Sequence, residues 1–486
     1  MKKTIYILTL LCAATSIQAQ VGIGTTTPDA SSVLDVTSTS KGFLPPRMTA
    51  AQRDAITSPA AGLMIWCTDC GATGEFQVNN GTEWADLSGQ LMNNNHELQG
   101  SEIDGEASND NSGGSVSLSS DGNTVAIGAS INDGNGAYAG QVRIYENISG
   151  TWTQVGSDID GEASYDQSGH SVSLSSDGST VAIGARYNDG TGNSAGHVRV
   201  YKYTSSTSTW TKLGSDIDGE ATYDQSSSSV SLSSDGSIVA IGAPYNDGNG
   251  SNAGHVRVYK YTSSTSTWTK LGSDIDGEAT NDNSGGSVSL SSDGSTVAIG
   301  AINNGSGAGH VRIYKYISST STWTKLGSDI DGESGGDNSG YSVSLSSDGS
   351  TVAIGARNNN AVGHVRVYKY TSSTSTWTQV GSDIDGQYGD DQFGFSVSLS
   401  SNGSIVAIGV PYNDGKNGRF SNVGQVEIYQ NISGTWTRIS SINGKITNDQ
   451  FGVSVSLSSD GSTVAIGAKN SDGSGPNCGS VGVYLK

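Results

Sequence analysis

Few residues of this sequence carry positive charge. Of its 486 residues, 25 are lysine or arginine and 46 are aspartate or glutamate, so the formal net charge is −21. Nucleic-acid binding needs clusters of basic residues that neutralise phosphates, and this balance therefore argues against a nucleic-acid partner. Beyond residue 19, no segment approaches the ~20 consecutive apolar residues of a membrane-spanning helix, so we expect no membrane span.

Cysteine is also scarce. The chain has four cysteines, of which Cys67 and Cys70 stand in the pattern Cys-Thr-Asp-Cys. No second pair of ligands accompanies them, so we favour a disulfide between Cys67 and Cys70 over half of a zinc site. A thioredoxin-like redox role would need a βαβ pattern around the motif, which the sequence does not show. Cys478 has no assigned partner.

Residues 1–19 have the features of a secretory signal peptide. They combine a positive start (MKK), an apolar run that ends at Leu11 and the small residue Ala19 before the cleavage point. We therefore predict a protein that is exported and either secreted or held at the cell surface. A lipoprotein anchor at Cys12 is the less favoured alternative, because the preceding residue is bulky.

Residues 20–90 contain short β-type runs separated by turn residues, which predicts a small β-rich N-terminal module. Its segments GIGTTTPDASSVLDV and KGFLPPRMT resemble a module that is common at the N-terminus of exported surface proteins of Bacteroidetes-type bacteria. The resemblance implies a location and no particular activity. A β module of this size often gains stability by oligomerising, which is one expectation here. Residues 91–95 read as a linker.

Residues 96–486 consist of a repeat of about 57 residues. One Asp-Gly or Asn-Gly turn marks each copy, at Asp121, Asp177, Asp235, Asp293, Asp348, Asn402 and Asp460. Alternating residues indicate four strands per copy, in the second copy at 171–175, 181–185, 197–203 and 210–213. We therefore predict an all-β fold, a seven-bladed β-propeller of four-stranded antiparallel blades. The alternative, an open β-solenoid, would have shorter coils and a capping repeat.

The two ends of the repeat region complement each other. The seventh copy stops at Lys486, directly after its third strand, whereas the six earlier copies continue into a strand that contains tryptophan. At the other end, residues 96–105 align with residues 152–161, which include such a strand. We predict that residues 96–100 complete the last blade and so cover two open sheet edges.

The repeats carry a family resemblance. Phe393-Gly394 and Phe451-Gly452 precede the SVSLS strand in two copies, and Gly-Ala-Pro (residues 242–244) follows the second strand of another. These features, with the VRVY strand, resemble the FG-GAP repeat of integrin-α-type propellers. Members that bind calcium carry a long acidic loop between the first two strands. Here that connection is only SSDGST, too short to wrap an ion with six or more oxygens, so calcium binding is not carried over.

The longest loops are expected on one face of the ring, where the fourth strand leads to the first and the second to the third. Their length varies most between copies, which indicates a binding face. The candidates for ligand contact on this face are Tyr187, Asn188, Asp189, Tyr245, Tyr412, Arg419 and Phe420. Tyrosine rings can stack on sugars or pack against a protein. The simpler alternative is that tyrosine covers the blade edge and Asn-Asp-Gly only forms a turn.

One aspartate of the long loops recurs in every copy. Its seven positions are Asp110, Asp166, Asp224, Asp282, Asp337, Asp391 and Asp449. A carboxylate that accepts backbone hydrogen bonds explains a ring of identical positions better than a single active centre does. A weak calcium candidate combines Asp160, Glu162 and Asp166. The seventh copy has Asn443 and Lys445 at the first two positions, which argues against an ion in every blade.

No catalytic arrangement stands out from the repeats. Four histidines, His197, His255, His310 and His364, begin the third strand of successive copies. They lie too far apart to share a metal, so packing at the strand edge is expected. The sequence therefore predicts no cofactor and a non-enzymatic, adhesion-type propeller that recognises an extracellular protein or glycan through its long-loop face. Two alternatives stay open, a polysaccharide hydrolase or lyase on a propeller scaffold, and a structural spacer of a surface fibre.

Overall fold

The computed structural model describes residues 21–23, 34–38, 44–70, 74–79, 84–86, 96–414 and 421–486. The expected signal peptide (1–19), the expected linker (91–95) and two ligand candidates, Arg419 and Phe420, lie outside the described residues. The chain divides into two compact units, Met1–Asn93 and Asn94–Lys486.

The described residues of the N-terminal unit form two small sheets. In the first, β1 (Val21–Ile23) pairs in parallel with β2 (Leu34–Val36). The second has the order β3 (Arg47–Met48), β4 (Met64–Cys67), β5 (Glu75–Asn79) and β6 (Trp84–Asp86).

A short helix, α1 (Ala50–Asp54), follows β3. The side chain of its N-cap Thr49 accepts a hydrogen bond from Gln52 N, and Gln52 Oε1 accepts one from Thr49 N. This capping box satisfies two backbone donors and explains why so short a helix begins there.

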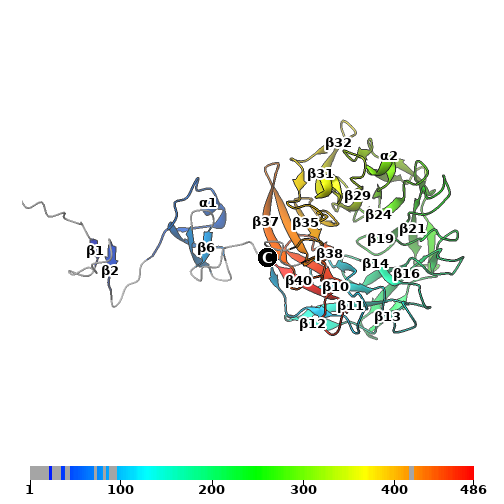
Figure 1. Ribbon diagram of the computed structural model, residues 1–486, viewed down its shortest axis with the longest axis horizontal. Coiled ribbons are helices and arrows are strands. Elements are labelled where there is room, and N and C mark those ends of the chain that lie inside the picture. Colours follow the sequence, from blue (N-terminus) through cyan, green and yellow to red (C-terminus); the bar gives the residue numbers. More distant parts are fainter. Residues whose placement is uncertain are drawn as a thin grey trace, which may run out of the picture. The chain divides into compact units, whose positions relative to one another are not determined.

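The unit Asn94–Lys486 is a ring of seven antiparallel sheets, which confirms the predicted seven-bladed propeller (Figure 1). We number the sheets as blades 1–7 in chain order and call the strands of each blade A to D. The A strands are β9 (Ser115–Leu118), β14 (Ser168–Leu174), β19 (Ser229–Leu232), β24 (Ser284–Leu290), β29 (Ser339–Leu345), β34 (Ser396–Leu399) and β38 (Phe451–Leu457). The B strands are β10 (Thr124–Ala129), β15 (Thr180–Ala185), β20 (Ile238–Ala243), β25 (Thr296–Ala301), β30 (Thr351–Ala356), β35 (Ile405–Val410) and β39 (Thr463–Ala468).

The outer strands follow the same order. The C strands are β11 (Gln141–Ile148), β16 (His197–Thr204), β21 (His255–Thr262), β26 (His310–Ile317), β31 (His364–Thr371), β36 (Gln425–Ile432) and β40 (Ser480–Leu485). The D strands are β12 (Thr151–Gln154), β17 (Thr209–Lys212), β22 (Thr267–Lys270), β27 (Thr322–Lys325), β32 (Thr376–Gln379), β37 (Thr435–Asn443) and β7 (Glu97–Leu98). Two single turns of helix, α2 (Asn304–Gly307) and η1 (Asn359–Ala361), lie in the B–C loops of blades 4 and 5.

A short fifth strand adds to this pattern, and it corrects the extent of the D–A loops. Six blades have an Ile-Asp strand that pairs with strand C: β13 (Ile159–Asp160), β18 (Ile217–Asp218), β23 (Ile275–Asp276), β28 (Ile330–Asp331), β33 (Ile384–Asp385) and β8 (Ile103–Asp104). Strand C of most blades has eight residues and strand D only four, so the remaining half of C is free to pair with Ile-Asp. Within the segment SDIDGEASYDQSG, only residues 161–167 therefore form the loop between β13 and β14.

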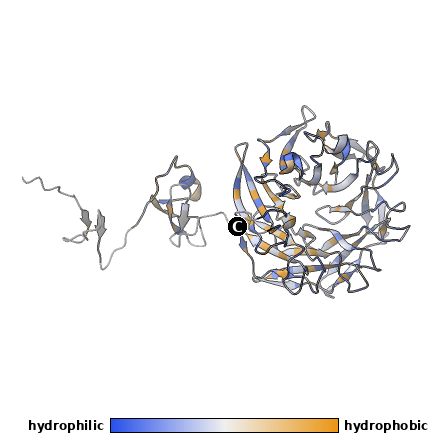
Figure 2. Ribbon diagram, in the orientation of Figure 1, coloured by the Kyte–Doolittle hydropathy of each residue, from blue (hydrophilic) through white to orange (hydrophobic). Residues whose placement is uncertain are grey.

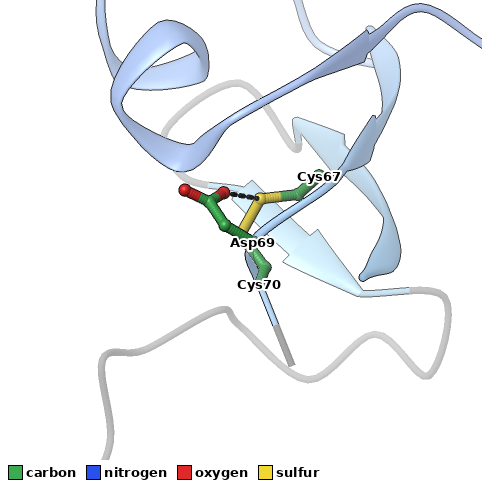
Figure 3. A group of neighbouring side chains, drawn as sticks. All are labelled: Cys67, Asp69 and Cys70. Atoms are coloured by element: carbon green, nitrogen blue, oxygen red, sulfur yellow. Dashed lines mark hydrogen bonds between the residues drawn. A yellow bond between two sulfur atoms is a disulfide. The ribbon is translucent and has the colours of Figure 1, made fainter. Parts of the chain in front are cut away.

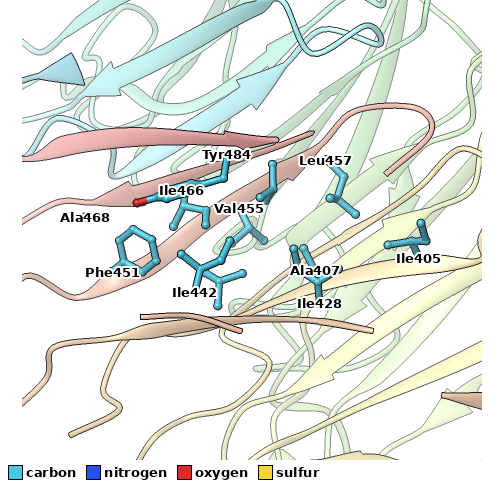
Figure 4. Close-up of a cluster of buried hydrophobic side chains, with 12 residues drawn as sticks. Ile405, Ala407, Ile428, Ile442, Phe451, Val455, Leu457, Ile466, Ala468 and Tyr484 are labelled. Carbon is cyan, nitrogen blue, oxygen red and sulfur yellow. The ribbon is translucent and has the colours of Figure 1, made fainter. Parts of the chain in front are cut away.

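The apolar core lies between neighbouring blades. Strand B is buried along its whole length in most blades, because both of its faces are covered by adjacent sheets. Figure 2 shows hydrophobic positions interspersed with polar ones along the strands of the ring. Figure 4 shows the cluster between blades 6 and 7, where Ile428 and Ile442 pack with Val455, Ile466 and Tyr484.

Serine and glycine in the repeat are explained by the close approach of the blades. An ideal Cβ on Gly128 of strand B would lie in severe contact with the carbonyl oxygen of Gly169 in the next blade. Along strand A, Ser117 Oγ accepts a hydrogen bond of 2.9 Å from Leu174 N of the next blade. These contacts require small residues, so the SVSLS and AIGA patterns specify how blades stack as well as how each sheet folds.

The two ends of the repeat region meet in blade 7. Strand β7 pairs antiparallel with β40, with Leu98 opposite Tyr484. Trp152 Nε1 of blade 1 donates a 2.9 Å hydrogen bond to the Gln99 carbonyl just after β7. The same bond joins Trp210 of blade 2 to the Val155 carbonyl, at 2.7 Å. The interface between blades 7 and 1 therefore repeats the contacts of the interface between blades 1 and 2.

The A–B turns line one end of the central channel. A pocket of ≈ 200 Å³ there is formed by equivalent leucines and serines of all seven A strands, such as Leu174 and Ser176. The aspartate of each turn is held locally: Asp177 accepts hydrogen bonds from Ser175 Oγ and Ser179 N. Burial raises the pKa of the Asp177 carboxyl, but these hydrogen bonds outweigh it, and the net shift is downward.

Candidate functional site

The long D–A and B–C loops gather on the other face of the ring, and neighbouring blades share them. Tyr165 N of the D–A loop entering blade 2 donates a 2.7 Å hydrogen bond to the Ala137 carbonyl in the B–C loop of blade 1. Tyr223 N makes the equivalent 2.8 Å bond to Asn193 O, one blade further. Any ligand on this face therefore meets loops of two adjacent blades together.

In blades 1–6 the recurring aspartate clamps the D–A loop to a B–C loop. Asp166 is 3% exposed, and its Oδ2 accepts hydrogen bonds from Ala163 N (3.1 Å) and Asn188 Nδ2 (3.0 Å). The same Asn-to-Asp bond joins Asn132 to Asp110, Asn246 to Asp224, Asn304 to Asp282, Asn359 to Asp337 and Asn413 to Asp391. Asn188 also accepts a bond from Gly190 N. This ligand candidate is thus buried and used within the loop.

Burial raises the pKa of several clamp carboxyls. The pKa of Asp166 is raised, mainly by desolvation and against the hydrogen bond from Asn188. The effect is larger for Asp391 and Asp449, whose pKa values rise to about 6 with the help of nearby acids. In blade 7 the residue at the position of the clamp asparagine is Ser471.

The three calcium candidates make three different contacts. Asp160 lies on β13, where its Oδ1 is 3.3 Å from Gln141 Nε2. Glu162 pairs with Arg199, with 3.4 Å between Oε1 and Nη1. Asp166 belongs to the clamp. Groups of acidic, histidine and cysteine ligand atoms within the described residues do include Glu162, but with other partners.

Two strongly exposed tyrosines, Tyr165 and Tyr223, line a hollow on this face. It has a volume of ≈ 390 Å³ and lies between blades 2 and 3. Its lining, which we call the tyrosine hollow, consists of Tyr165, Gln167, Tyr187, Asp189, Asn193, Ser194 and Tyr223. As whole residues, Tyr165 and Tyr223 are 62% and 61% exposed. The hollow therefore combines aromatic faces with hydrogen-bonding amide, carboxylate and hydroxyl groups.

Two of these tyrosines have an unusual backbone. Tyr165 has φ 74° and Tyr223 has φ 70°, in the left-handed region that bulky residues rarely adopt. The other five copies have Asn109, Asn281, Gly336, Asp390 and Asn448 at this position. Asparagine, aspartate and glycine tolerate this conformation, whereas tyrosine does so at a cost. Tyr138 (φ 52°), a neighbour of Tyr165 with ring centroids 5.8 Å apart, extends the aromatic surface.

The other ligand candidates are spread around the ring. Tyr187 contributes to the hollow, and the Arg186 guanidinium lies 4.6 Å from its ring centroid. Asp189 also lines the hollow and accepts a 2.7 Å bond from Ser194 N. Tyr245 is exposed on blade 3.

Tyr412 of blade 6 is half-buried in an aromatic group. Its ring packs edge-on against Phe395, with 6.1 Å between the centroids. Phe395 in turn lies 5.0 Å from the ring of Tyr341, over which the Arg357 guanidinium sits at 3.7 Å. Tyr412, in the B–C loop of blade 6, is therefore held by aromatic packing.

In the N-terminal unit, Cys67 and Cys70 form a disulfide (Figure 3). Asp69 lies between them in the sequence, and its Oδ1 is 3.3 Å from Cys67 Sγ and accepts a 2.6 Å bond from Ala50 N. Asp69 thus links the turn closed by the disulfide to the first residue of α1. Cys478 is a free, buried cysteine of the propeller.

The comparison with known families agrees with this architecture. The family described as FG-GAP repeat matches residues 444–484, which run from the loop before β38 to β40. The family described as phage tail like trimerisation region matches residues 22–104, which include β7 and β8. No curated protein matches the chain. The unit Asn94–Lys486 is thus a β-propeller scaffold, and its resemblance to FG-GAP repeats is confirmed for the seventh copy.

Within the described part of the chain, no helix is long and apolar enough to cross a membrane.

Proposed function

We propose that this protein is an exported, adhesion-type propeller that binds a glycan through the tyrosine hollow. The proposal selects the glycan from the two ligand classes that the sequence predicts. The backbone conformation of Tyr165 and Tyr223 is the observation that carries it. Five other blades place small or αL-tolerant residues at this position, so folding alone does not call for tyrosine there.

Residues with a strained backbone conformation cluster at functional sites, where the side chain serves a purpose other than folding. Tyr165 and Tyr223 are each more than 60% exposed, so packing within the propeller offsets little of the cost of the left-handed backbone. Their exposed rings instead offer flat apolar faces to the solvent. A sugar ring presents C–H groups on one face, which pack on such an aromatic surface, while its hydroxyls need polar partners at the edge.

The rest of the hollow supplies those polar partners. Gln167, Asp189, Asn193 and Ser194 offer donors and acceptors around the aromatic surface. A largely apolar protein interface would have fewer such groups at its centre. The lining therefore supports a neutral or hydroxyl-rich saccharide better than a protein surface.

We infer a binding role and not catalysis because the acidic groups of this face are repeated from blade to blade. The clamp aspartates serve the same structural purpose in blades 1–6, as their identical bonds to asparagine indicate. A hydrolase would need a carboxylate pair in one blade that differs from the others.

The N-terminal match supports a multivalent arrangement. If the region over residues 22–104 trimerises as its family description states, three hollows are carried by one assembly. Weak individual saccharide contacts then add to a much stronger attachment, because the second and third contacts become intramolecular. This arrangement suits adhesion at a cell surface.

The proposal is tested on the full chain with a glycan array, in the presence of calcium and of EDTA. The double variant Tyr165→Asn/Tyr223→Asn installs the residue that blades 1, 4 and 7 already use, so its fold should be retained. We expect it to lose at least about tenfold in affinity for the glycans that the wild type binds, because the loss of two aromatic contacts of about 0.5–1.5 kcal/mol each corresponds to a loss of this order. The matched control is Tyr388→Asn, which removes an equally exposed tyrosine of blade 6 outside the hollow.

Three outcomes contradict the proposal. If the double variant binds glycans as well as the wild type does, the tyrosine hollow is not the binding site. Turnover of a bound polysaccharide supports the hydrolase or lyase alternative. Absence of any glycan binding, with the trimer intact, supports the fibre spacer.

A further inference from the structure

We propose that Glu333, His364 and Asp383 form a binding site for a divalent cation of the zinc type, between blades 4 and 5. His364 is the first residue of β31, Glu333 follows β28, and Asp383 directly precedes β33. One ligand atom from each of the three side chains lies within 4.8 Å of the other two. His364 Nδ1 is 3.9 Å from Glu333 Oε2 and 3.8 Å from Asp383 Oδ2.

The histidine is buried and its Nδ1 has no hydrogen-bond partner. The side chain of His364 is 1% exposed, so water does not satisfy this nitrogen either. A buried polar atom without a partner is costly and rare in folded proteins. The separations from both carboxylates are too long for hydrogen bonds. They are close to those of atoms that share one metal ion.

The distances fit a small cation after a modest inward movement. Zinc binds histidine nitrogen and carboxylate oxygen at about 2.0–2.2 Å, which places neighbouring ligand atoms somewhat more than 3 Å apart. Glu333 is 45% and Asp383 27% exposed, so both carboxylates have freedom to approach His364. Their exposed side also leaves room for a water molecule as the fourth ligand.

The donor set favours a transition metal over calcium. An imidazole nitrogen with two carboxylate oxygens is typical of zinc and its neighbours, whereas calcium prefers six or more oxygen ligands. The site thus differs in chemistry and in place from the loop calcium sites of related propellers.

The neighbouring blades contain the same three residues, but with a competing cation. The equivalent trios are Glu162–His197–Asp216, Glu220–His255–Asp274 and Glu278–His310–Asp329. In these blades a lysine ammonium binds the aspartate at 2.7 to 2.8 Å: Lys212 to Asp216, Lys270 to Asp274 and Lys325 to Asp329. In blade 5 the lysine is replaced by Gln379, whose neutral Nε2 donates to Asp383 Oδ1 at 2.6 Å.

Blade 5 therefore has one positive charge fewer beside its ligands. The remaining cation near the site is Arg366, and its 3.8 Å separation from Glu333 is the longest of the arginine–glutamate pairs at this position. Arg366 also donates a 2.7 Å bond to the Asp331 carbonyl, as the equivalent arginines of blades 2–4 do to Asp160, Asp218 and Asp276. Among the four trios, that of blade 5 should attract a metal ion most strongly.

Blade 7 shows what happens when the histidine is absent. Ser480 takes the histidine position, and Lys445 and Glu102 take the positions of Glu333 and Asp383. Lys445 Nζ and Glu102 Oε1 form an ion pair of 2.6 Å. A lysine ammonium thus supplies in blade 7 the positive charge that we assign to a metal ion in blade 5.

Such an ion would connect two blades. Glu333 belongs to the segment that leaves blade 4, whereas His364 and Asp383 belong to blade 5. A bound cation would therefore stabilise the ring in addition to the apolar contacts between these blades.

The test uses the full, tag-free chain with its disulfide intact, titrated with Zn²⁺ alone in a calorimeter and with Co²⁺ for its absorption spectrum. We expect saturation near one ion per chain at the tight site, and a higher Tm when zinc is bound. His364→Gln should weaken this binding more than about 100-fold. Glutamine is the natural residue at this position in blades 1 and 6, so the variant should fold.

Two further variants change no ligand. Gln379→Lys introduces into blade 5 the lysine of blades 2–4 and should weaken zinc binding about 10–100-fold. Lys212→Gln removes the lysine of blade 2 and should create a second site of comparable strength. His197→Gln, the matched control, should leave the tight site unchanged.

The proposal is overturned by any of three results. One is the absence of saturable Zn²⁺ binding to the wild type. Another is zinc binding of unchanged strength and stoichiometry in both His364→Gln and Gln379→Lys. The third is loss of the tight site on reduction of the Cys67–Cys70 disulfide or in His197→Gln, which would assign the ion elsewhere. If His364→Gln fails to fold, Gln379→Lys decides the matter alone.

Discussion

The backbone N–H of Ser459 donates a 2.9 Å hydrogen bond to the carbonyl oxygen of Ser120, which precedes it by 339 residues. The bond joins the A–B turn of blade 7 to that of blade 1. Equivalent 2.8 to 2.9 Å bonds run from Ser120 to Ser176 and onward through Ser234, Ser292, Ser347, Ser401 and Ser459. The seven bonds form a closed circle around the channel. The first and last blades therefore meet with the same geometry as consecutive blades.

Closure of the ring predicts equal effects of equivalent tryptophans. Trp152→Phe removes the hydrogen bond to the Gln99 carbonyl, and Trp210→Phe removes the bond to Val155 O. Each should lower the free energy of unfolding by about 1–2 kcal/mol, since each also shrinks a half-buried ring. Denaturant unfolding measures both. A neutral Trp152→Phe beside a destabilising Trp210→Phe would show that β7 does not close blade 7.

Truncation of the chain before or after β7 also tests whether this strand closes blade 7. A chain that begins at residue 96 keeps β7, whereas one that begins at residue 101 loses β7 and the partner of Trp152. The longer chain should unfold at the same temperature as the propeller of the full protein. The shorter one should lose roughly 3 kcal/mol, because two sheet edges are exposed together. Equal Tm values for the two truncations contradict this expectation.

Replacing a strained tyrosine of the hollow should stabilise the protein while weakening the proposed glycan binding. Tyr165→Asn replaces a bulky residue at φ 74° by one that tolerates the left-handed region. We expect the free energy of unfolding to rise by about 1 kcal/mol. Asn281→Tyr, the reverse change in blade 4, is the control and should destabilise by a similar amount. A stability loss in Tyr165→Asn would mean that the ring is retained for packing.

The clamp carboxyls predict a specific pH dependence. The folded-state pKa of Asp391 is raised to about 6, chiefly by burial, above the ~3.9 of an unfolded chain. A raised pKa means that the contribution of Asp391 to stability is present below about pH 4 and is lost as the pH rises through 6. Asp391→Asn should therefore stabilise the protein at pH 7 by about 1 kcal/mol after allowance for solvent screening. The difference from wild type should vanish near pH 4 in urea titrations at a series of pH values.

The aspartates of the A–B turns provide a control, because the pKa of Asp177 is shifted in the opposite direction to that of Asp391. The pKa of Asp177 is lowered, because hydrogen bonds from Ser175 and Ser179 outweigh burial. Asp177→Asn should destabilise at pH 7, and the effect should fade as the pH falls through the lowered pKa. Blade 6 has Asn402 at this position, so the substitution is compatible with the turn. Equal pH profiles for both variants would contradict the assignment of the two shifts.

The N-terminal match predicts the oligomeric state. Sedimentation of the full chain should give a trimer, and the chain that begins at residue 96 should give a monomer. A monomeric full chain would remove the multivalent arrangement and leave each propeller to bind alone. A trimeric truncation would place the contact in the propeller instead.

The sequence was sufficient for the architecture because the repeat encodes it many times over. The Asp-Gly turn and the period-2 strands recur in seven copies, and each copy supports the same interpretation. The role of SVSLS could not be read from one copy, since Ser117 and Leu174 bond across a blade boundary. The sequence does not predict the Ile-Asp strand, because two residues are too few to show the alternation of apolar and polar residues that marks a strand.

The site was harder to predict for a related reason. The Tyr-Asn-Asp-Gly motif singles out Tyr187 but not Tyr165 and Tyr223, because the distinction of these two residues lies in the backbone angle. A comparison between copies contains the signal, since tyrosine replaces αL-tolerant residues at this one position. The histidines of different blades lie too far apart to share a metal, but the sequence does not show that Glu333 and Asp383, from segments on either side, lie beside His364.

Amide hydrogen exchange tests the closed ring most directly. The seven amides of Ser120, Ser176, Ser234, Ser292, Ser347, Ser401 and Ser459 each donate one bond of the circle. A closed ring predicts that Ser459 is protected to the same degree as the other six, because its bond breaks only when two blades separate. Rapid exchange at Ser459 with slow exchange at the other six would show that blades 7 and 1 form an open edge.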